Sequence, residues 1–328
     1  MIIKTFFPFR VLTNQNLEQE FPEWNADKIG QKVGIFSRHV ASEEETPLDL
    51  AEKACVGLFQ DHPEIKGAVD YLLFCTQNPD YILPGNSSIL QNRLGLPTSI
   101  GALDYNLGCS GYIYGLSLAK GLLLGHVAKG VLLVTAEAYT KRINRKDKGN
   151  RSIFGDAATA TFLTEEDAGK IGEFVLGTDG SGADNLIIRN GGVRCRSGNK
   201  DEKTYGSGNI YTDDDLYMDG PEIFNFTIET VPGLIQNTLT KNNLEDKDVS
   251  YYIFHQANAY ILKYLQAIMN IPSEKFWIDM RETGNTVSSS IPIALNEAVT
   301  SRTVCAGQTV VLSGFGVGYS FGAVPIVL

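Results

Sequence analysis

The chain has 328 residues, of which 43% are hydrophobic and 20% are charged, and its formal net charge is −10. The length allows two core-bearing units of roughly 150 residues each, and the composition is that of a globular protein. The negative charge argues against a nucleic-acid binder. No apolar run is long enough to span a bilayer and the N-terminus lacks a signal-peptide pattern, so we expect no membrane association.

The cysteines lie at positions 55, 75, 109, 195 and 305. Their number is odd and none forms a Cys-x-x-Cys pair, so neither a disulfide framework nor a zinc site is expected. This pattern favours a cytoplasmic enzyme, and we predict that it binds no metal.

The predicted elements alternate between helices and buried strands. After an N-terminal region that we expect to be irregular, the pattern predicts a helix over 47–59, a strand over 69–75 and a short helix over 86–94. A strand over 102–106 leads into a long helix after residue 109, and further strands follow over 130–136 and 156–164. Near-continuous apolar strands between helices indicate an α/β fold with a sheet covered on both faces.

The second half of the chain repeats the plan of the first. The segment 71–78 resembles 251–258 at a spacing of 180 residues, 132–134 resembles 310–312 at 178, and 107–109 resembles 283–285 at 176. Three matches in one order predict two similar halves, residues 1–168 and 169–328, related by a pseudo-twofold axis. Ligand sites favour strand ends and domain seams, so we expect the functional site between the halves.

Residues 177–217 interrupt this repeat. The segment is rich in Gly, Asn, Asp, Arg and Lys, and it is too long for a simple connection. We interpret it as either a functional cover or a mobile loop. A long helix is predicted over 219–239.

Positive charge gathers in residues 141–151, which carry six basic residues and one acidic residue. A second polar loop follows with Arg189, Arg194, Arg196 and Lys200. A charge run is most often a solvated loop. The more specific, functional interpretation is a basic rim that receives an anionic carrier or a nucleotide.

Cys109 lies between Gly108 and Gly111 at the predicted strand-to-helix turn. The unpaired N–H groups and the positive dipole end of the helix would favour its thiolate, which is the nucleophilic form. A lone cysteine is more often a small core residue. This stretch alone leaves both interpretations open.

Two polar residues of the second half are candidates to join Cys109. His255 ends an apolar strand, unlike the other histidines, which are expected to be structural or solvated: His39, His62 and His126. Asn285 follows a glycine and is expected to be a helix N-cap, a role that uses its carbonyl oxygen and leaves its NH₂ free to donate. The glycine-rich run 313–318 predicts a tight turn whose N–H groups could face an oxyanion.

Five motifs in one order carry a family resemblance: Gly-Cys-Ser-Gly, Phe-Gly-Asp-Ala-Ala (154–158), His-Gln-Ala-Asn, Gly-Asn-Thr and Gly-Phe-Gly-Val-Gly. From about residue 34 to the C-terminus, the chain resembles β-ketoacyl-acyl carrier protein synthase III, a thiolase-fold condensing enzyme. The resemblance implies a five-layered αβαβα core. It implies that Cys109 accepts the acyl group and that His255 and Asn285 form the decarboxylation site.

The resemblance also implies the surroundings of these residues. Backbone N–H groups of Cys109 and Val317, beside Gly316, would form the oxyanion hole, and Phe315 would pack beside the triad in the acyl pocket. The loop 76–84 would be a dimer loop that lends Tyr81 or Ile82 to the acyl pocket of a partner subunit, although an ordinary turn is an equal alternative.

The implied reaction joins an acyl thioester to malonyl-acyl carrier protein and releases CO₂. It gives a β-ketoacyl thioester for fatty-acid synthesis or for specialised lipids or polyketides. The implied substrates are acyl-CoA or acyl-carrier protein and malonyl-carrier protein, the implied assembly is a homodimer, and no cofactor is needed. The C-terminal glycine turn holds Phe315 and no cysteine, which disfavours the reversible thiolase reaction.

The chain departs from the family pattern at the positions that bind the coenzyme A of the acyl donor. The Trp and Arg that clamp coenzyme A in the family are replaced by Lys28 and Lys32, and the basic residue expected after His-Gln-Ala-Asn is Tyr260. The candidate carrier-binding or CoA-binding residues are therefore Lys32, Arg151, Asn258 and Lys263. The donor, the starter chain and the pathway stay open.

Two alternative functions use the same residues differently. An acyltransferase of this family would pass the acyl group from Cys109 to an oxygen or nitrogen nucleophile. A non-catalytic partner subunit would only shape the pocket of a neighbour, and the retention of Cys109, His255 and Asn285 argues against that role.

Overall fold

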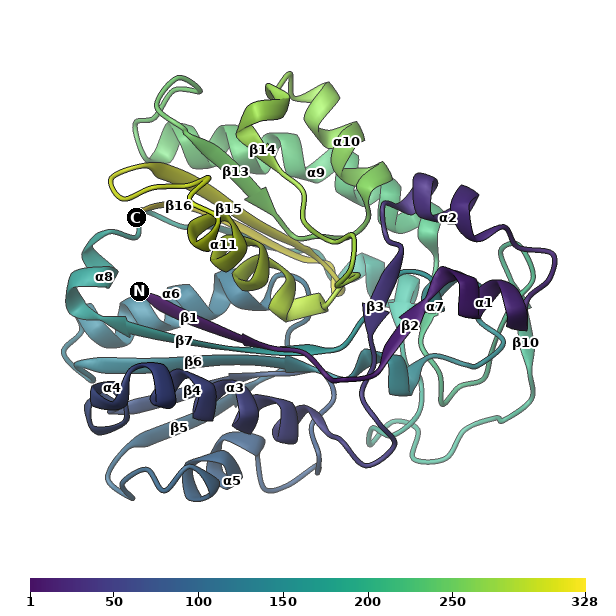
Figure 1. Ribbon diagram of the computed structural model, residues 1–328, viewed down its shortest axis with the longest axis horizontal. Helices are drawn as coiled ribbons and strands as arrows, with labels where there is room; N and C mark the ends of the chain where they lie inside the picture. The colour runs from purple at the N-terminus through teal and green to yellow at the C-terminus, as the bar shows by residue number, and fades with distance from the viewer.

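Two five-stranded sheets with the same strand order form the frame of the protein (Figure 1). The computed structural model describes residues 1–328. The first sheet has the order β1-β7-β6-β4-β5, with strands β1 (Ile2–Phe6), β4 (Tyr71–Cys75), β5 (Gly101–Tyr105), β6 (Gly130–Glu137) and β7 (Ala157–Thr164). The second has the order β8-β16-β15-β13-β14, with strands β8 (Val175–Thr178), β13 (Tyr251–Phe254), β14 (Phe276–Trp277), β15 (Thr309–Gly316) and β16 (Ser320–Val327).

The pairing directions of the two sheets also correspond. β4 lies parallel to β5 and β6, as β13 lies parallel to β14 and β15. β7 lies antiparallel to β6 and β1, as β16 lies antiparallel to β15 and β8. Two of the matched segment pairs thus occupy equivalent strands, and the third pair, 107–109 and 283–285, lies in turns before helices, which confirms the two pseudo-twofold halves. The proposed boundary at 168/169 falls in the short helix α8 (Glu165–Gly169) and stays a proposal.

Helices fill the space between the sheets and cover both outer faces (Figure 1). α6 (Gly111–Leu124) and α11 (Ser290–Thr300) share one core with both sheets. α3 (Pro47–Asp61), α4 (Pro63–Ala68) and α5 (Asn86–Arg93) pack on the first sheet, while α9 (Gly220–Lys241) and α10 (Ala259–Ile268) pack on the second. This is the predicted αβαβα arrangement.

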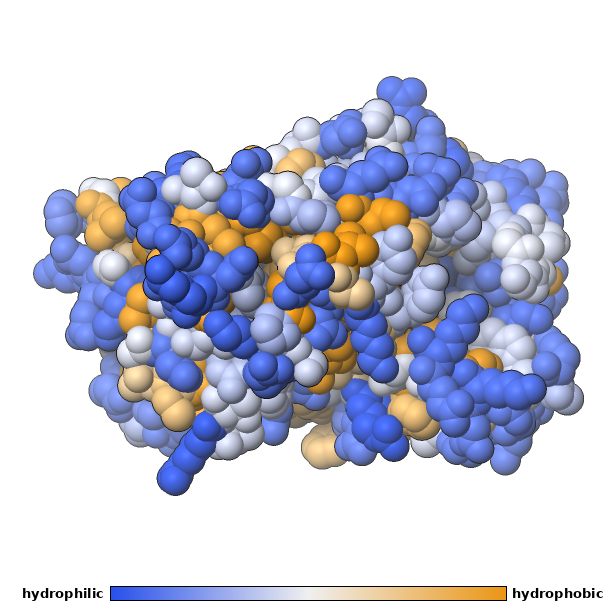
Figure 2. Space-filling view, turned by 90° about the horizontal axis from the view of Figure 1, so that it is seen from above, coloured by the Kyte–Doolittle hydropathy of each residue, from blue (hydrophilic) through white to orange (hydrophobic).

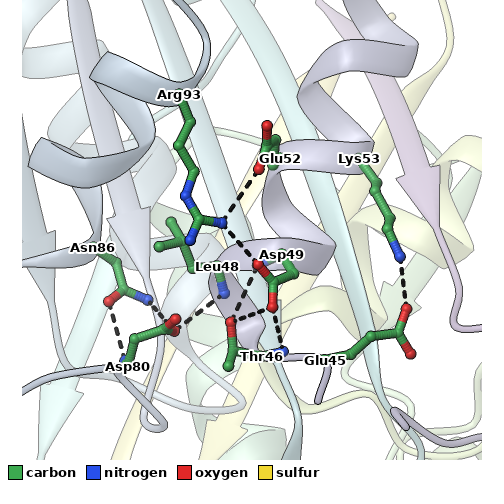
Figure 3. A network of polar contacts seen from close by, with 9 residues as sticks. All are labelled: Glu45, Thr46, Leu48, Asp49, Glu52, Lys53, Asp80, Asn86 and Arg93. Carbon is green, nitrogen blue, oxygen red and sulfur yellow. Dashed lines mark hydrogen bonds and ion pairs between the residues drawn. The ribbon is translucent and has the colours of Figure 1, made fainter.

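A polar network joins the start of α3 to both ends of α5 (Figure 3). Thr46 and Asp49 form a capping box at the start of α3, with the Asp49 carboxylate accepting the Thr46 N–H at 2.9 Å. Arg93 of α5 donates to the same carboxylate at 2.7 Å. Asp80 and Asn86 bond each other reciprocally in the loop between β4 and α5. These hydrogen bonds therefore hold the part of the loop around Asp80 against the start of α5.

The N-terminal region is ordered, and the prediction that it is irregular is wrong. It forms β1 at the edge of the first sheet, followed by β2 (Val11–Thr13), α1 (Asn14–Glu20), α2 (Ala26–Val33) and β3 (Ser37–His39). Every residue of β1 is only partly buried. A short strand on a sheet edge lacks the continuous apolar run that marks an interior strand, so its sequence gives a weak signal.

The segment 177–217 folds into short paired strands rather than a plain loop. β9 (Leu186–Ile187) pairs with β12 (Tyr217–Met218), and β10 (Lys203–Tyr205) pairs with β11 (Asn209–Tyr211). Tyr205 donates to Asp147, just before α7 (Lys148–Arg151), at 2.6 Å. The segment is thereby attached to the basic stretch 141–151 at one end of the molecule.

The face of the molecule seen from above is mixed, with apolar residues lying among hydrophilic ones, most clearly in the upper half of the view (Figure 2). None of the helices combines the length with the apolar character needed to cross a bilayer.

Candidate active site

The three predicted catalytic side chains line one cavity of about 140 Å³ between the halves. Cys109 lies in the turn before α6, Asn285 in the turn before α11, and His255 directly after β13. The two turns belong to the equivalent central helices of the pseudo-twofold fold. The site therefore uses one turn from each half and one strand end.

The turn that carries Cys109 is packed closely against β15. A Cβ atom on Gly316 would lie 2.8 Å from Cys109 Cβ and 3.0 Å from Cys109 Sγ. A Cβ atom on Gly314 would lie 2.7 Å from the Cys109 carbonyl oxygen. The glycine-rich run was predicted to be a turn, but it continues β15 through Gly316. Its glycines are needed because the strand runs against the nucleophile turn.

Burial determines the protonation state of Cys109 at rest. Burial raises the pKa of its thiol to about 12, with a further contribution from the Glu137 carboxyl. A helix N-terminus stabilises a negative charge by at most about 2 kcal/mol. Raising a thiol pKa from 9 to about 12 corresponds to about 4 kcal/mol. Burial thus outweighs the expected effect of the helix dipole, and Cys109 rests as a thiol.

His255 is buried and neutral. Desolvation lowers the pKa of His255 to about 3. Its Nδ1 atom lies 2.7 Å from the Ser290 hydroxyl, and its Nε2 atom lies 3.4 Å from the Asn285 side-chain nitrogen. The ring of Phe315 packs edge-on against the imidazole, with centroids 5.9 Å apart. Phe315 also lines the cavity, as the resemblance implied.

Asn285 presents its amide nitrogen to the histidine. Its Oδ1 atom accepts the Val287 N–H at 2.9 Å, which leaves Nδ2 on the side of His255 Nε2. The expected use of the carbonyl oxygen is therefore confirmed, but the expected helix N-cap is wrong. Asn285 caps a local turn, and α11 begins only at Ser290.

Apolar residues complete the cavity wall. They come from the segment before β7, from β9 and β12, and from the start of α9, namely Ile153, Phe154, Leu186, Met218 and Ile223. The segment 177–217 thus supplies Leu186, and Met218 follows directly. Sequence reasoning named none of these five as wall residues, because their approach depends on the packing of distant segments.

Glu137 is a buried carboxyl group that sequence reasoning missed. It ends β6 and accepts hydrogen bonds from the Gln77 N–H and from the hydroxyls of Thr76 and Ser288. Desolvation raises the pKa of Glu137 well above its usual value. Ser288 belongs to the other half, so this carboxyl links the two halves near Cys109. Its only sequence signal was an acidic residue at the end of an apolar strand.

The predicted acyl-pocket residues of loop 76–84 do not reach the cavity of their own chain. Tyr81 is 60% exposed and Ile82 is 89% exposed. Both lie outside the cavity lining. This placement leaves their predicted role in a partner subunit as a prediction.

The predicted carrier-binding residues do not form one set. Asn258 lines the cavity and caps α10, because its Oδ1 accepts the Ile261 N–H. Lys32 lies in the last turn of α2, and Lys263 lies in α10, which contacts α2. Arg151 is instead paired with Glu20, with Nη1 2.6 Å from its carboxylate.

The predicted basic rim is partly neutralised, because three of the six basic residues of 141–151 form ion pairs. Besides the Arg151 pair, Lys148 pairs with Glu23 at 2.7 Å and Lys146 pairs with Glu202 at 2.6 Å. These acidic partners lie at least 56 residues away along the chain. A local count of charges therefore overestimated the positive field of this stretch.

Comparisons with known proteins agree along the whole chain. Residues 103–180 match the family 3-oxoacyl-[acyl-carrier-protein] synthase III, and residues 239–328 match the C-terminal model of the same family. The β-ketoacyl-[acyl-carrier-protein] synthase III of Clostridium perfringens (strain ATCC 13124) is 34% identical over 325 residues, which is 98% of this chain and 97% of the relative.

Solved structures show the same likeness. A crystal structure of a 3-oxoacyl-(acyl-carrier-protein) synthase III has a TM-score of 0.97 at 42% identity and covers 100% of this chain and 98% of that chain. The β-ketoacyl-[acyl carrier protein] synthase III of Thermus thermophilus has a TM-score of 0.87 at 31% identity, covering 99% of this chain and 98% of that chain. With its fold, its cavity residues and its full-length similarity in agreement, the chain belongs to the 3-oxoacyl-[acyl-carrier-protein] synthase III family.

Proposed function

We propose that this protein condenses an acyl thioester with malonyl-acyl carrier protein and releases CO₂. The observation that carries the proposal is the convergence of Cys109, His255 and Asn285 on one cavity. A thiol supplies a nucleophile for acyl transfer, and two neutral N–H donors suit a developing enolate. The names of the relatives point to the same acyl-carrier chemistry.

In the first half-reaction, the sulfur of Cys109 attacks the thioester carbonyl of the donor. The thioester C–S bond breaks, an acyl–Cys109 bond forms, and the Cys109 proton ends on the departing thiol. We assign the oxyanion to the backbone N–H groups of Cys109 and Val317. The close packing of Gly316 on Cys109 supports this assignment, because it brings the start of the β15–β16 turn to the nucleophile.

In the second half-reaction, the malonyl carboxylate leaves as CO₂ and the thioester oxygen gains enolate charge. His255 Nε2 and Asn285 Nδ2, which lie 3.4 Å apart, would both donate to this oxygen. A pKa of about 3 keeps His255 neutral, so the enolate is stabilised by hydrogen bonds rather than by a cation. The carbanion then attacks the acyl–Cys109 carbonyl, and breakage of the acyl–sulfur bond regenerates the thiol after protonation.

We further propose that carrier protein and donor approach along α2 and α10. Lys32 and Lys263 lie on these two contacting helices, and Asn258 at the start of α10 lines the cavity. Positive side chains suit the phosphate of an acyl carrier or of coenzyme A. Arg151 has its acidic partner Glu20 within the chain, so we assign it a lesser part.

We also propose a homodimer in which the loop 76–84 contributes to the pocket of the partner subunit. β5 is an edge strand with Leu103 43% exposed, and the loop presents Tyr81, Ile82 and Leu83 to solvent. An edge strand with neighbouring exposed apolar side chains is a template for pairing with another chain. The network around Asp80 fixes the base of this loop (Figure 3).

Side chains and backbone groups suffice for each step, so we propose that no cofactor takes part. All cysteines are unpaired, which fits a reducing compartment, and we propose the cytoplasm as the location. The reaction would serve the initiation of fatty-acid synthesis or a specialised lipid or polyketide route.

The test is intact-mass spectrometry combined with measurement of CO₂ release. The protein is incubated with a panel of acyl-CoA and acyl-carrier donors and then with malonyl-carrier protein. We expect one acyl adduct in wild type and in Cys55→Ala, a buried cysteine of α3 outside the cavity, and none in Cys109→Ala. An adduct without CO₂ release would instead indicate acyl transfer to another nucleophile, and the absence of both would refute the proposal.

A further inference from the structure

The hydroxyl of Ser290 contacts His255 at Nδ1, the ring nitrogen that does not face Asn285. Ser290 begins α11, and its Oγ lies 2.7 Å from His255 Nδ1 on the side of the ring opposite to Nε2. Both residues are only 2% exposed. The Gln256 N–H donates to the same hydroxyl oxygen at 3.4 Å. Ser290 is not part of the cavity wall, so any effect on the reaction must pass through His255.

Counting protons decides the direction of this hydrogen bond. A neutral imidazole carries one N–H, on either Nδ1 or Nε2. If Nδ1 carried it, Ser290 Oγ would accept from both Nδ1 and the Gln256 N–H. The only partners of the Ser290 hydroxyl are these two groups. Its own proton would then be buried without an acceptor, which is unfavourable. If Nε2 carries the N–H, the Ser290 hydroxyl donates to Nδ1 at 2.7 Å, while Nε2–H and the Asn285 amide both face the cavity, where a substrate oxygen can accept from them. The other tautomer would let Asn285 Nδ2 donate to Nε2 only over 3.4 Å, which is a weaker contact than the one at 2.7 Å.

We propose that Ser290 is a positioning residue that holds His255 in the Nε2–H tautomer. This tautomer aims an N–H into the cavity beside Asn285 Nδ2, which faces it at 3.4 Å. The two donors then converge on the position of the substrate oxygen. The opposite tautomer would present the Nε2 lone pair to the enolate oxygen and repel it. The inference rests on the proposed function and adds the residue that orients its decarboxylation site.

The kinetic test compares the two half-reactions in Ser290→Ala, Ser290→Thr and Ser289→Ala. We expect Ser290→Ala to slow CO₂ release from malonyl-carrier protein about tenfold, because one hydrogen bond to His255 is lost. Acylation of Cys109 should keep its rate, since it does not use His255. Ser290→Thr keeps the hydroxyl and should recover most of the CO₂ release. Ser289→Ala is the matched control, since Ser289 bonds Thr135 and not His255.

A spectroscopic readout separates orientation from a merely structural role. Nitrogen NMR of ¹⁵N-histidine-labelled protein, with His255→Gln for assignment, reports which ring nitrogen carries the proton. We expect Nε2–H in wild type and in Ser290→Thr, and a mixture of tautomers in Ser290→Ala. This spectrum needs no turnover, so it stays decisive if the condensation reaction itself is not found, and the wild-type spectrum stays decisive if Ser290→Ala does not fold. A wild-type proton on Nδ1, or unchanged CO₂ release in a folded Ser290→Ala, would overturn the proposal.

Discussion

The contact between β15 and the nucleophile turn makes Gly316→Ala an informative perturbation. The added Cβ would lie 2.8 Å from Cys109 Cβ and 3.0 Å from Cys109 Sγ, whereas ordinary contacts of this kind begin at 3.4 Å. The turn and the strand must therefore separate by about 0.6 Å. The turn cannot easily move away, because Cys109 leads directly into α6, whose buried face packs between both sheets.

Two effects of this separation can be estimated. Overpacking of a buried contact typically costs about 1–3 kcal/mol of folding free energy. Misplacement of a reacting atom by about 1 Å can cost on the order of a hundredfold in rate. A shift of about 0.6 Å should thus slow acylation of Cys109 by roughly tenfold or more. The assay is the single-turnover rate of acyl–Cys109 formation by rapid-quench mass spectrometry, with thermal unfolding of the same sample.

Gly121→Ala is the matched control for this experiment. Gly121 lies in α6, the helix that follows Cys109, and a Cβ there meets nothing within 4 Å. Removing a helical glycine should raise stability by up to about 1 kcal/mol and leave acylation unchanged. If Gly316→Ala acylated at the wild-type rate with an unchanged melting temperature, the inferred packing of β15 on Cys109 would be incorrect.

Three further predictions concern charge. The pKa of His255 is lowered to about 3, so the unfolded chain binds a proton below pH 6.5 that the folded protein does not. Urea unfolding should show a loss of about 2 kcal/mol from this group between pH 6.5 and 5, absent in His255→Gln. Burial raises the pKa of Glu137, so the folded wild type keeps a proton that the unfolded chain loses, and wild type loses stability as the pH rises. Glu137→Gln lacks this proton, so its unfolding free energy relative to wild type should increase from pH 5 to pH 8, by up to about 1.4 kcal/mol per pH unit. If the difference in unfolding free energy between Glu137→Gln and wild type did not change with pH, the Glu137 carboxyl would be ionised in the folded protein at little cost. Arg151→Ala should lower the unfolding free energy in urea by less than about 1 kcal/mol, since its partner Glu20 is half exposed; a larger loss would make this pair a structural element.

The convergence of the candidate site residues could be predicted because two local signals coincide at each of them. Cys109 combines a reactive residue type with a glycine-flanked strand-to-helix turn, and Asn285 occupies the matching turn of the repeat. Polarity at the end of an apolar strand marked His255. Interior strands such as β4 and β13 were also predictable, since burial on both faces requires continuous apolar runs.

The remaining features depend on contacts between distant segments and leave no local signal. Arg151 looked like a free cation, yet Glu20 lies 131 residues away in sequence and 2.6 Å away in space. Ser290 was one of three consecutive serines, and only the fold distinguishes it by its distance to His255. The raised pKa of Cys109 could not be predicted for the same reason, because the local helix is visible in the sequence and the degree of burial is not.

The pseudo-twofold fold explains why residues far apart in sequence meet at one cavity. In each half, the turn before the central helix lies at the boundary between the halves. The turn before α6 therefore faces the equivalent turn before α11. Cys109 before α6 and Asn285 before α11 occupy these two turns, and β15 reaches Cys109 only because its residues there are glycines. The two halves thus share one frame but differ in the groups they place at the cavity: the first supplies a sulfur, and the second supplies N–H donors. Ser290, as the first residue of the second central helix, lies where that frame can orient His255 without entering the cavity.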